Sequence, residues 1–260
     1  HRIGVGLYDL VDGRLVRRDR IEVDVAGERT ELPQLAGVPA ADVLLLNDDD
    51  LTYAKLRLDE RSMAVVVQHI AGFESSLARG LCWAAAWDMV RDAELAARDY
   101  VALALAGLPA ETDINLVTQT LRQTTAALTS YADPGWAPTG WAQLAATART
   151  ALRAAEPGSG LQLAWARAYA SAARSDDELA VLRGWLDGVD VPAGLTVDTE
   201  LRWSLLRALV AGGAAGRAEI DAELAADRTS SGEREAELAR ALLPAPEDKA
   251  EVWRVLTEVP

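Results

Sequence analysis

The sequence predicts a mainly α-helical protein, in which a small antiparallel β-sandwich portion precedes a HEAT-like α-α superhelix. The first observation is a change of hydrophobic period. Up to residue 58 apolar side chains occupy every second position, as between Ile21 and Val25, and after residue 61 they recur every third or fourth position, as between Trp83 and Val90. A period of two is typical of a half-buried strand and a period of 3.6 of an amphipathic helix. The second observation is a series of helix-start signals confined to the later region.

Composition narrows the class of protein and its partners. The chain has 260 residues, half of them apolar, so it is long enough to bury a substantial core. Its net charge of -14 argues against nucleic acid and against an anionic membrane surface, because both attract Lys and Arg. An apolar run of about 18 residues, the length that spans a bilayer, does not occur. We therefore expect neither a nucleic-acid nor a membrane partner.

Cysteine usage and the start of the chain suggest its context. The single cysteine, Cys82, cannot form an internal disulfide and lies among apolar helical residues, so we expect a buried, unreactive thiol. A chain without an internal disulfide is typical of a reducing compartment, so the predicted location is cytoplasmic. The chain begins at His1 and soon enters an apparent strand, from which we expect a piece of a larger protein.

Two β-hairpins are predicted in the first 59 residues. Residues 3–10 and 15–25 alternate around Asp12-Gly13, a dipeptide that favours the tight turn of a hairpin. The apolar run 43–46 and the alternating segment 52–58 are expected to form the second hairpin. We assign residues 1–59 to a partial β-sandwich domain.

Residues 60–260 are assigned to a helical C-terminal domain that we expect to be truncated at its end. The predicted helix starts are the capping-box pairs Ser175 with Glu178 and Ser230 with Glu233, the N-caps Asp113 and Asp198, and the first-turn Pro246. Helix pairs such as 176–187 with 198–211 span roughly the 35–45 residues of a HEAT-like unit. This spacing favours a curved solenoid.

Catalytic motifs are missing from the sequence. The two histidines, His1 and His69, do not have the spacing of a metal-binding pair, and no H-E-x-x-H or G-x-S-x-G motif occurs. The acidic run Asp48 to Asp50 lacks the glycine that a calcium loop needs, so we predict a solvated turn. We therefore predict no catalytic, cofactor-binding or metal-ligating residue in this chain.

Two segments resemble aminopeptidase N-type zinc metallopeptidases. Residues 47–59 are similar to the last hairpin of that family's β-sandwich, where an Asn, here Asn47, begins the turn and a Tyr-centred strand, here around Tyr53, leads into the helical domain. Residues 79–92 are similar to the first long helices of the C-terminal domain in the actinobacterial branch, as are residues 200–203 to a later helix. The residues that we single out as a structural motif are Asn47, Tyr53, Trp83, Trp87, Asp88, Arg202 and Trp203.

The resemblance implies a role without catalysis for this chain. It implies the C-terminal portion of a zinc-dependent aminopeptidase, a hydrolase that removes N-terminal residues from peptides, with zinc held in a catalytic domain outside this sequence. Such a portion encloses the active-site cleft and gates peptide access, and its partners are its own N-terminal and catalytic domains and peptide substrates. Arg79 and Arg91 are the candidates to face a peptide's carboxylate. The chain alone is predicted to be inactive because it lacks H-E-x-x-H.

An alternative from another class stays open at this point. A free-standing HEAT-like adaptor would bind a partner protein on its concave face. An H-E-x-x-H motif encoded upstream of His1 would favour the peptidase over the adaptor.

Overall fold

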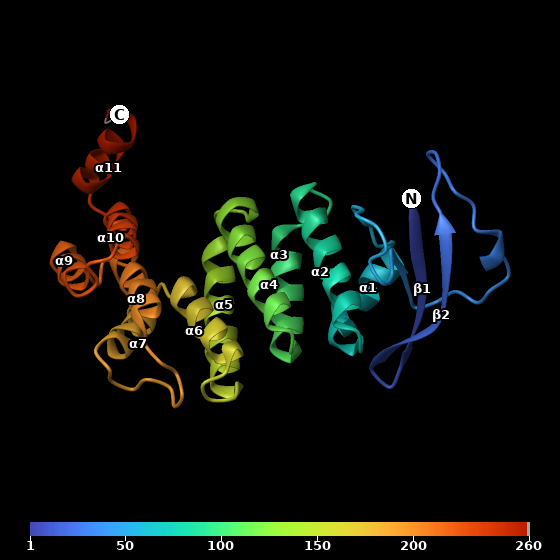
Figure 1. Cartoon of the computed structure of the whole chain (residues 1–260), viewed down its shortest axis with the longest axis horizontal. Helices are drawn as coiled ribbons and strands as arrows, with labels where there is room; N and C mark the ends of the chain where they lie inside the picture. The colour runs from blue at the N-terminus through green and yellow to red at the C-terminus, as the bar shows by residue number, and fades with distance from the viewer. Residues whose placement is uncertain (259–260) are drawn as a thin grey trace. The chain divides into compact units, whose positions relative to one another are not determined.

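A computed structural model describes residues 1–258 (Figure 1). Its internal contacts divide the chain into two compact units, unit 1 from His1 to Gly140 and unit 2 from Trp141 onward. Strands occur at the beginning of unit 1 and helices make up most of the remainder, so the predicted mainly α fold with a small antiparallel β portion is confirmed. The predicted domain division at residue 59 and the HEAT-like superhelix stay predictions.

The sheet of unit 1 has three antiparallel strands. They are β1 (Arg2–Val11), β2 (Arg14–Asp24) and β3 (Val43–Leu46), in the order β2-β1-β3. Asp12 and Gly13 have φ values of 49° and 79°, which is the left-handed conformation of a two-residue hairpin turn. The first predicted hairpin is therefore confirmed. Val5, Leu7 and Val23 form the centre of a small apolar core on this sheet.

The second predicted hairpin is wrong. Residues 52–58 run without a strand partner, and β3 pairs with β1 instead. Asn47 explains the difference, because its side chain donates to the Thr52 carbonyl at 2.7 Å and accepts from the Thr52 amide at 3.2 Å. These bonds close the turn after β3 through a side chain rather than through a strand ladder. Tyr53, expected at the centre of a strand, is fully exposed.

The α-helices of unit 1 all follow the last strand of the sheet. They are α1 (Glu60–His69), α2 (Ser76–Arg91), α3 (Ala97–Gly107) and α4 (Ile114–Ala126), with a π-helical turn, η4 (Ala127–Tyr131), after α4 and the short 3-10 helices η1 (Pro33–Leu35), η2 (Ile70–Gly72) and η3 (Leu108–Ala110). Asp113 caps α4 as predicted, since its carboxylate accepts from the Asn115 amide at 2.9 Å. Helix α1 packs against β3 and so joins the sheet to the helices of this unit.

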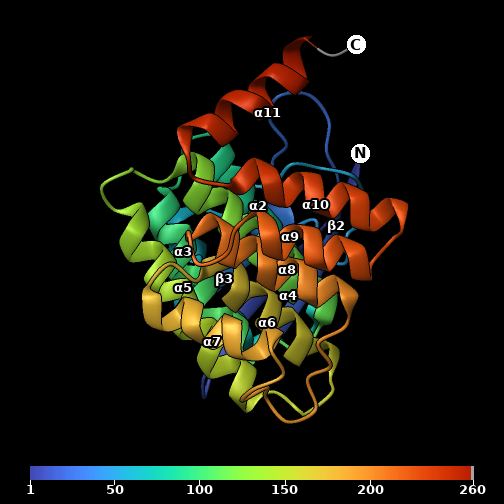
Figure 2. The same ribbon diagram turned by 90° about the vertical axis from the view of Figure 1, so that its left-hand side faces the viewer.

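Helix α5 (Ala137–Ala154) begins at the end of unit 1 and continues into unit 2. The later helices are α6 (Gly160–Ala172), α7 (Asp176–Leu186), α8 (Thr199–Ala211), α9 (Arg217–Ala226), α10 (Ser230–Leu242) and α11 (Pro246–Glu258). Helix α10 packs against both α8 and α9, and the three lie side by side in Figure 2. None of the helices within residues 1–258 is both long and apolar enough to cross a membrane.

Most of the predicted helix starts in unit 2 are confirmed. Ser175 and Glu178 form a capping box, Asp198 caps α8, and α11 begins at Pro246. The prediction at Ser230 is wrong by one residue. Thr229 is the N-cap of α10, and its hydroxyl accepts from the Gly232 amide at 3.0 Å. Both residues carry a hydroxyl group suited to capping, and the backbone conformation decides between them.

Candidate functional site

Helix α2 carries most of the residues singled out from the sequence. The Ser75 hydroxyl caps its start by accepting from the Ala78 amide. Trp83 is 3% exposed, and Trp87 is half-buried with its ring 5.7 Å from that of Tyr131 in an edge-to-face arrangement. Both indoles therefore contribute to the packing of unit 1.

Arg79, predicted to face a peptide, lies in a buried ion pair. Its Nε and Nη2 donate to the two carboxylate oxygens of Glu111 at 2.6 and 2.8 Å, and its Nη1 donates to the Phe73 carbonyl at 2.7 Å. Both ionic side chains are largely removed from solvent. This arrangement favours a structural role for Arg79 over the predicted peptide-facing one, because its donors are already occupied.

Arg91 has a different environment at the end of α2. Its Nη1 lies 4.0 Å from the Asp88 carboxylate, at the limit of an ion pair, and more than half of the arginine side chain is exposed. A surface pair of this kind contributes little to stability. Arg91 can therefore reach an external carboxylate, and its peptide-facing role stays a prediction.

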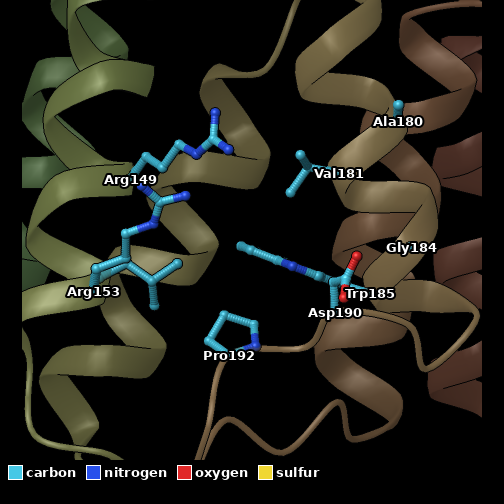
Figure 3. Close-up of a pocket in the computed structure, with 9 residues that line it drawn as sticks. Arg149, Arg153, Ala180, Val181, Gly184, Trp185, Asp190 and Pro192 are labelled. Atoms are coloured by element: carbon cyan, nitrogen blue, oxygen red, sulfur yellow. The ribbon is translucent and has the colours of Figure 1, made fainter.

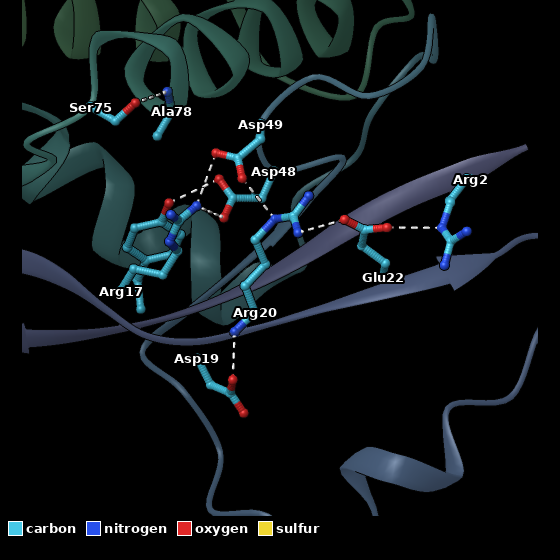
Figure 4. A network of polar contacts seen from close by, with 10 residues as sticks. Arg2, Arg17, Asp19, Arg20, Glu22, Asp48, Asp49, Ser75 and Ala78 are labelled. Atoms are coloured by element: carbon cyan, nitrogen blue, oxygen red, sulfur yellow. Dashed lines mark hydrogen bonds and ion pairs between the residues drawn. The ribbon is translucent and has the colours of Figure 1, made fainter.

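The acidic turn that starts with Asn47 is only partly solvated. Asp48 is 1% exposed and accepts from the Tyr8 hydroxyl at 2.9 Å. It also pairs with Arg17 at 3.0 Å, and Figure 4 shows these two side chains facing each other. The prediction of a solvated turn is therefore wrong for Asp48, although it holds for Asp49 and Asp50, which are exposed. Burial and the hydrogen bond to Asp48 raise the pKa of Tyr8, so the hydroxyl stays protonated. The network anchors the turn to β1 and β2.

Arg202 and Trp203 are neighbours on α8, and both bind residues at the C-terminal half of α9 or just after it. The Arg202 guanidinium makes a two-pronged contact with Glu223, each hydrogen bond being 2.7 Å long. The indole N–H of Trp203 donates to the Asp227 carboxylate at 2.9 Å. Both residues therefore act as packing and positioning elements of unit 2.

The described residues do not fit a zinc site. No cluster of three or more His, Cys, Asp or Glu side chains within residues 1–258 is arranged to hold a metal ion. His69 ends α1 as a half-buried residue, and Cys82 is fully buried. These residue types are the usual zinc ligands, and neither of the two residues belongs to such a cluster within the described range.

Sequence patterns did not predict the side chains that bind Arg79 and Asp48 and so determine their structural roles. Glu111 follows Arg79 by 32 residues, and Tyr8 precedes Asp48 by 40. One available signal was the hairpin register, which places Arg17 opposite Tyr8. A local signal for Glu111 was its position two residues before the helix cap Asp113, where its carboxylate accepts the amides of Thr112 and Asp113.

Comparison with known proteins defines the family. Residues 43–260 match the model of the ERAP1-like C-terminal domain, and the chain belongs to this family. It is also 51% identical over 259 residues to the aminopeptidase N of Streptomyces lividans. That alignment covers 99% of this chain and 30% of the relative, so the chain spans less than a third of the protein that it resembles. The resemblance to the C-terminal region of an aminopeptidase N is confirmed.

Proposed function

We propose that this chain is the non-catalytic C-terminal portion of a zinc-dependent aminopeptidase that removes N-terminal residues from peptides. Its role is to enclose the catalytic cleft and to limit which peptides enter. The observation that carries this proposal is the family match over residues 43–260, together with the 51% identity to a protein named aminopeptidase N. The match favours this role over that of a free-standing adaptor.

The proposed contribution of the chain is shape and charge. Closing a site excludes water and positions the substrate, and both effects require rigid walls. The buried pair Arg79–Glu111 and the bonded Arg202–Glu223 supply such rigidity within their own units. Arg91 is the exposed cation that we propose to meet a peptide's terminal carboxylate. The zinc and the general base belong to a separate catalytic domain, the partner that this portion would cover.

A cytoplasmic location is part of the proposal. Its support is the single, fully buried Cys82, which is compatible with a reducing compartment.

Removal of unit 2 from the whole enzyme tests the gating role. The truncated enzyme should end at residue 136, before α5 begins. This cut removes unit 2 together with residues 137–140 of unit 1, and it retains the sheet and helices α1–α4. We expect turnover of peptides to fall by roughly tenfold or more because orientation and water exclusion are lost. Bound zinc, measured by elemental analysis, should remain stoichiometric.

A small aminoacyl dye provides the matched control substrate. It is too short to need a wall beyond the catalytic centre, so its hydrolysis should change much less than that of peptides. Circular dichroism establishes that the truncated enzyme is folded. Unchanged kinetics on peptides of several lengths would refute gating and leave unit 2 a role in stability or docking alone.

A further inference from the structure

Unit 2 contains a pocket between α5 and α7. It has a volume of about 560 Å³ and is lined by Arg149 and Arg153 from α5, Val181 and Trp185 from α7, and Asp190 and Pro192 from the following loop (Figure 3). This volume is within the range of small-molecule sites, roughly 300–1,000 Å³. None of the roles described above uses these residues.

Two exposed arginines bring positive charge to this pocket. They are four residues apart and therefore share one face of α5, and Figure 3 shows both side chains directed into the space between α5 and α7. Neither makes an ion pair or side-chain hydrogen bond with any residue of the described range 1–258. Like charges at this spacing destabilise a helix. Arg153 in the last turn gains from the helix dipole, whereas Arg149 lies a turn earlier.

A buried tyrosine whose hydroxyl has no partner within residues 1–258 packs against Trp185 of the lining. Tyr169 is 1% exposed, and its hydroxyl has no hydrogen-bond partner among the described residues. Burial is the main cause that raises the pKa of Tyr169, so the hydroxyl stays protonated. Its ring packs against Trp185, with centroids 5.5 Å apart. Tyr169 is therefore connected to the pocket through the ring of Trp185, which lines it, and its own hydrogen bonding is incomplete.

Asp190 adds one negative charge to the lining. It has a φ of 52°, so the loop after α7 holds it in a left-handed conformation. Its carboxylate makes no ion pair within the part of the chain that the structure describes. The pocket thus carries two cationic groups and one anionic group, and its ideal ligand has the opposite pattern.

We propose that this pocket binds a small molecule with two carboxylate groups and one ammonium group, the chemistry of a free acidic amino acid. Each guanidinium can hold a carboxylate through two parallel hydrogen bonds. The ammonium group pairs with Asp190. This assignment uses only residues of unit 2 and does not depend on the proposed peptidase role.

Calorimetric titration of the full-length protein with L-glutamate tests the site. Glutarate, which has the same two carboxylates but no ammonium group, and inorganic phosphate are the comparison probes. We expect glutamate to bind, with Arg149→Gln and Arg153→Gln each weakening binding by roughly tenfold or more. Arg122→Gln is the matched control, because Arg122 is an exposed arginine on α4 of unit 1, and it should leave affinity unchanged. Asp190→Asn should weaken glutamate but not glutarate.

A rise in melting temperature with glutamate gives a second readout on the unaltered protein. Absence of both calorimetric heat and a thermal shift overturns the site, as does equal affinity in the Arg149→Gln and Arg122→Gln variants. Glutarate or phosphate binding as tightly as glutamate overturns the assignment of an amino acid. Arg149→Lys retains the charge with fewer donors and should bind with intermediate affinity.

Discussion

Replacing Trp203 by alanine is expected to lower the free energy of unfolding of unit 2 by about 3–5 kcal/mol. The indole is 2% exposed and its N–H donates to Asp227 at 2.9 Å, so truncation leaves both a cavity and a carboxylate without this donor. Denaturant unfolding followed by circular dichroism measures the loss as a lower transition midpoint.

Trp253 provides the same substitution at an exposed position. It lies on α11 with 70% of its surface accessible, so Trp253→Ala should change the free energy of unfolding by no more than about 0.5 kcal/mol. Similar destabilisation by the two variants would contradict the assignment of Trp203 to the core of unit 2.

Breaking the Arg79–Glu111 pair should have an effect of comparable size in unit 1. The guanidinium donates to both carboxylate oxygens at 2.6 and 2.8 Å, and Arg79→Met leaves the Glu111 charge buried without its partner. We expect a loss of about 3–5 kcal/mol in the free energy of unfolding. The double variant Arg79→Met/Glu111→Leu should lose much less than the sum of the single variants. Additive losses in this double-mutant cycle would show that the two groups are not energetically coupled.

The Arg79–Glu111 pair also makes the free energy of unfolding of unit 1 depend on pH. Burial raises the pKa of Glu111, but the hydrogen bonds from Arg79 and from the backbone outweigh burial and leave the pKa below its ordinary value of 4.5. The folded state therefore binds this proton less tightly than the unfolded state. Its stabilising contribution is complete above about pH 4.5 and is lost as the pH falls through the lowered value. The difference in stability between the unaltered chain and Glu111→Gln should shrink over that range, and a constant difference would contradict this linkage.

Features set by neighbouring residues were predictable from the sequence. Asp12-Gly13 predicts the first turn because both residues tolerate the left-handed conformation that the turn adopts. The capping box of Ser175 and Glu178 is likewise contained within four residues. The second hairpin was predicted wrongly, because the alternation of residues 52–58 is equally compatible with an extended segment fixed by the Asn47 side chain.

Features set by distant residues were predicted less well. Arg79 looks like an exposed helix arginine until Glu111 is placed beside it, and Asp48 looks like a turn residue until Tyr8 and Arg17 enclose it. The pocket of unit 2 had a visible signal in the spacing of Arg149 and Arg153. Sequence alone could not distinguish that pair from two solvated arginines, since the opposing wall comes from α7 and the loop after it.

Because Cys82 is buried, the rate at which its thiol reacts can report local opening of unit 1. It is the single cysteine, it is fully enclosed within unit 1, and burial raises the pKa of its thiol. An alkylating reagent attacks the thiolate, so modification has to wait until α2 separates from its surroundings. The alkylation rate, followed by mass spectrometry, therefore measures how often unit 1 opens under native conditions, without an engineered label and independently of unit 2.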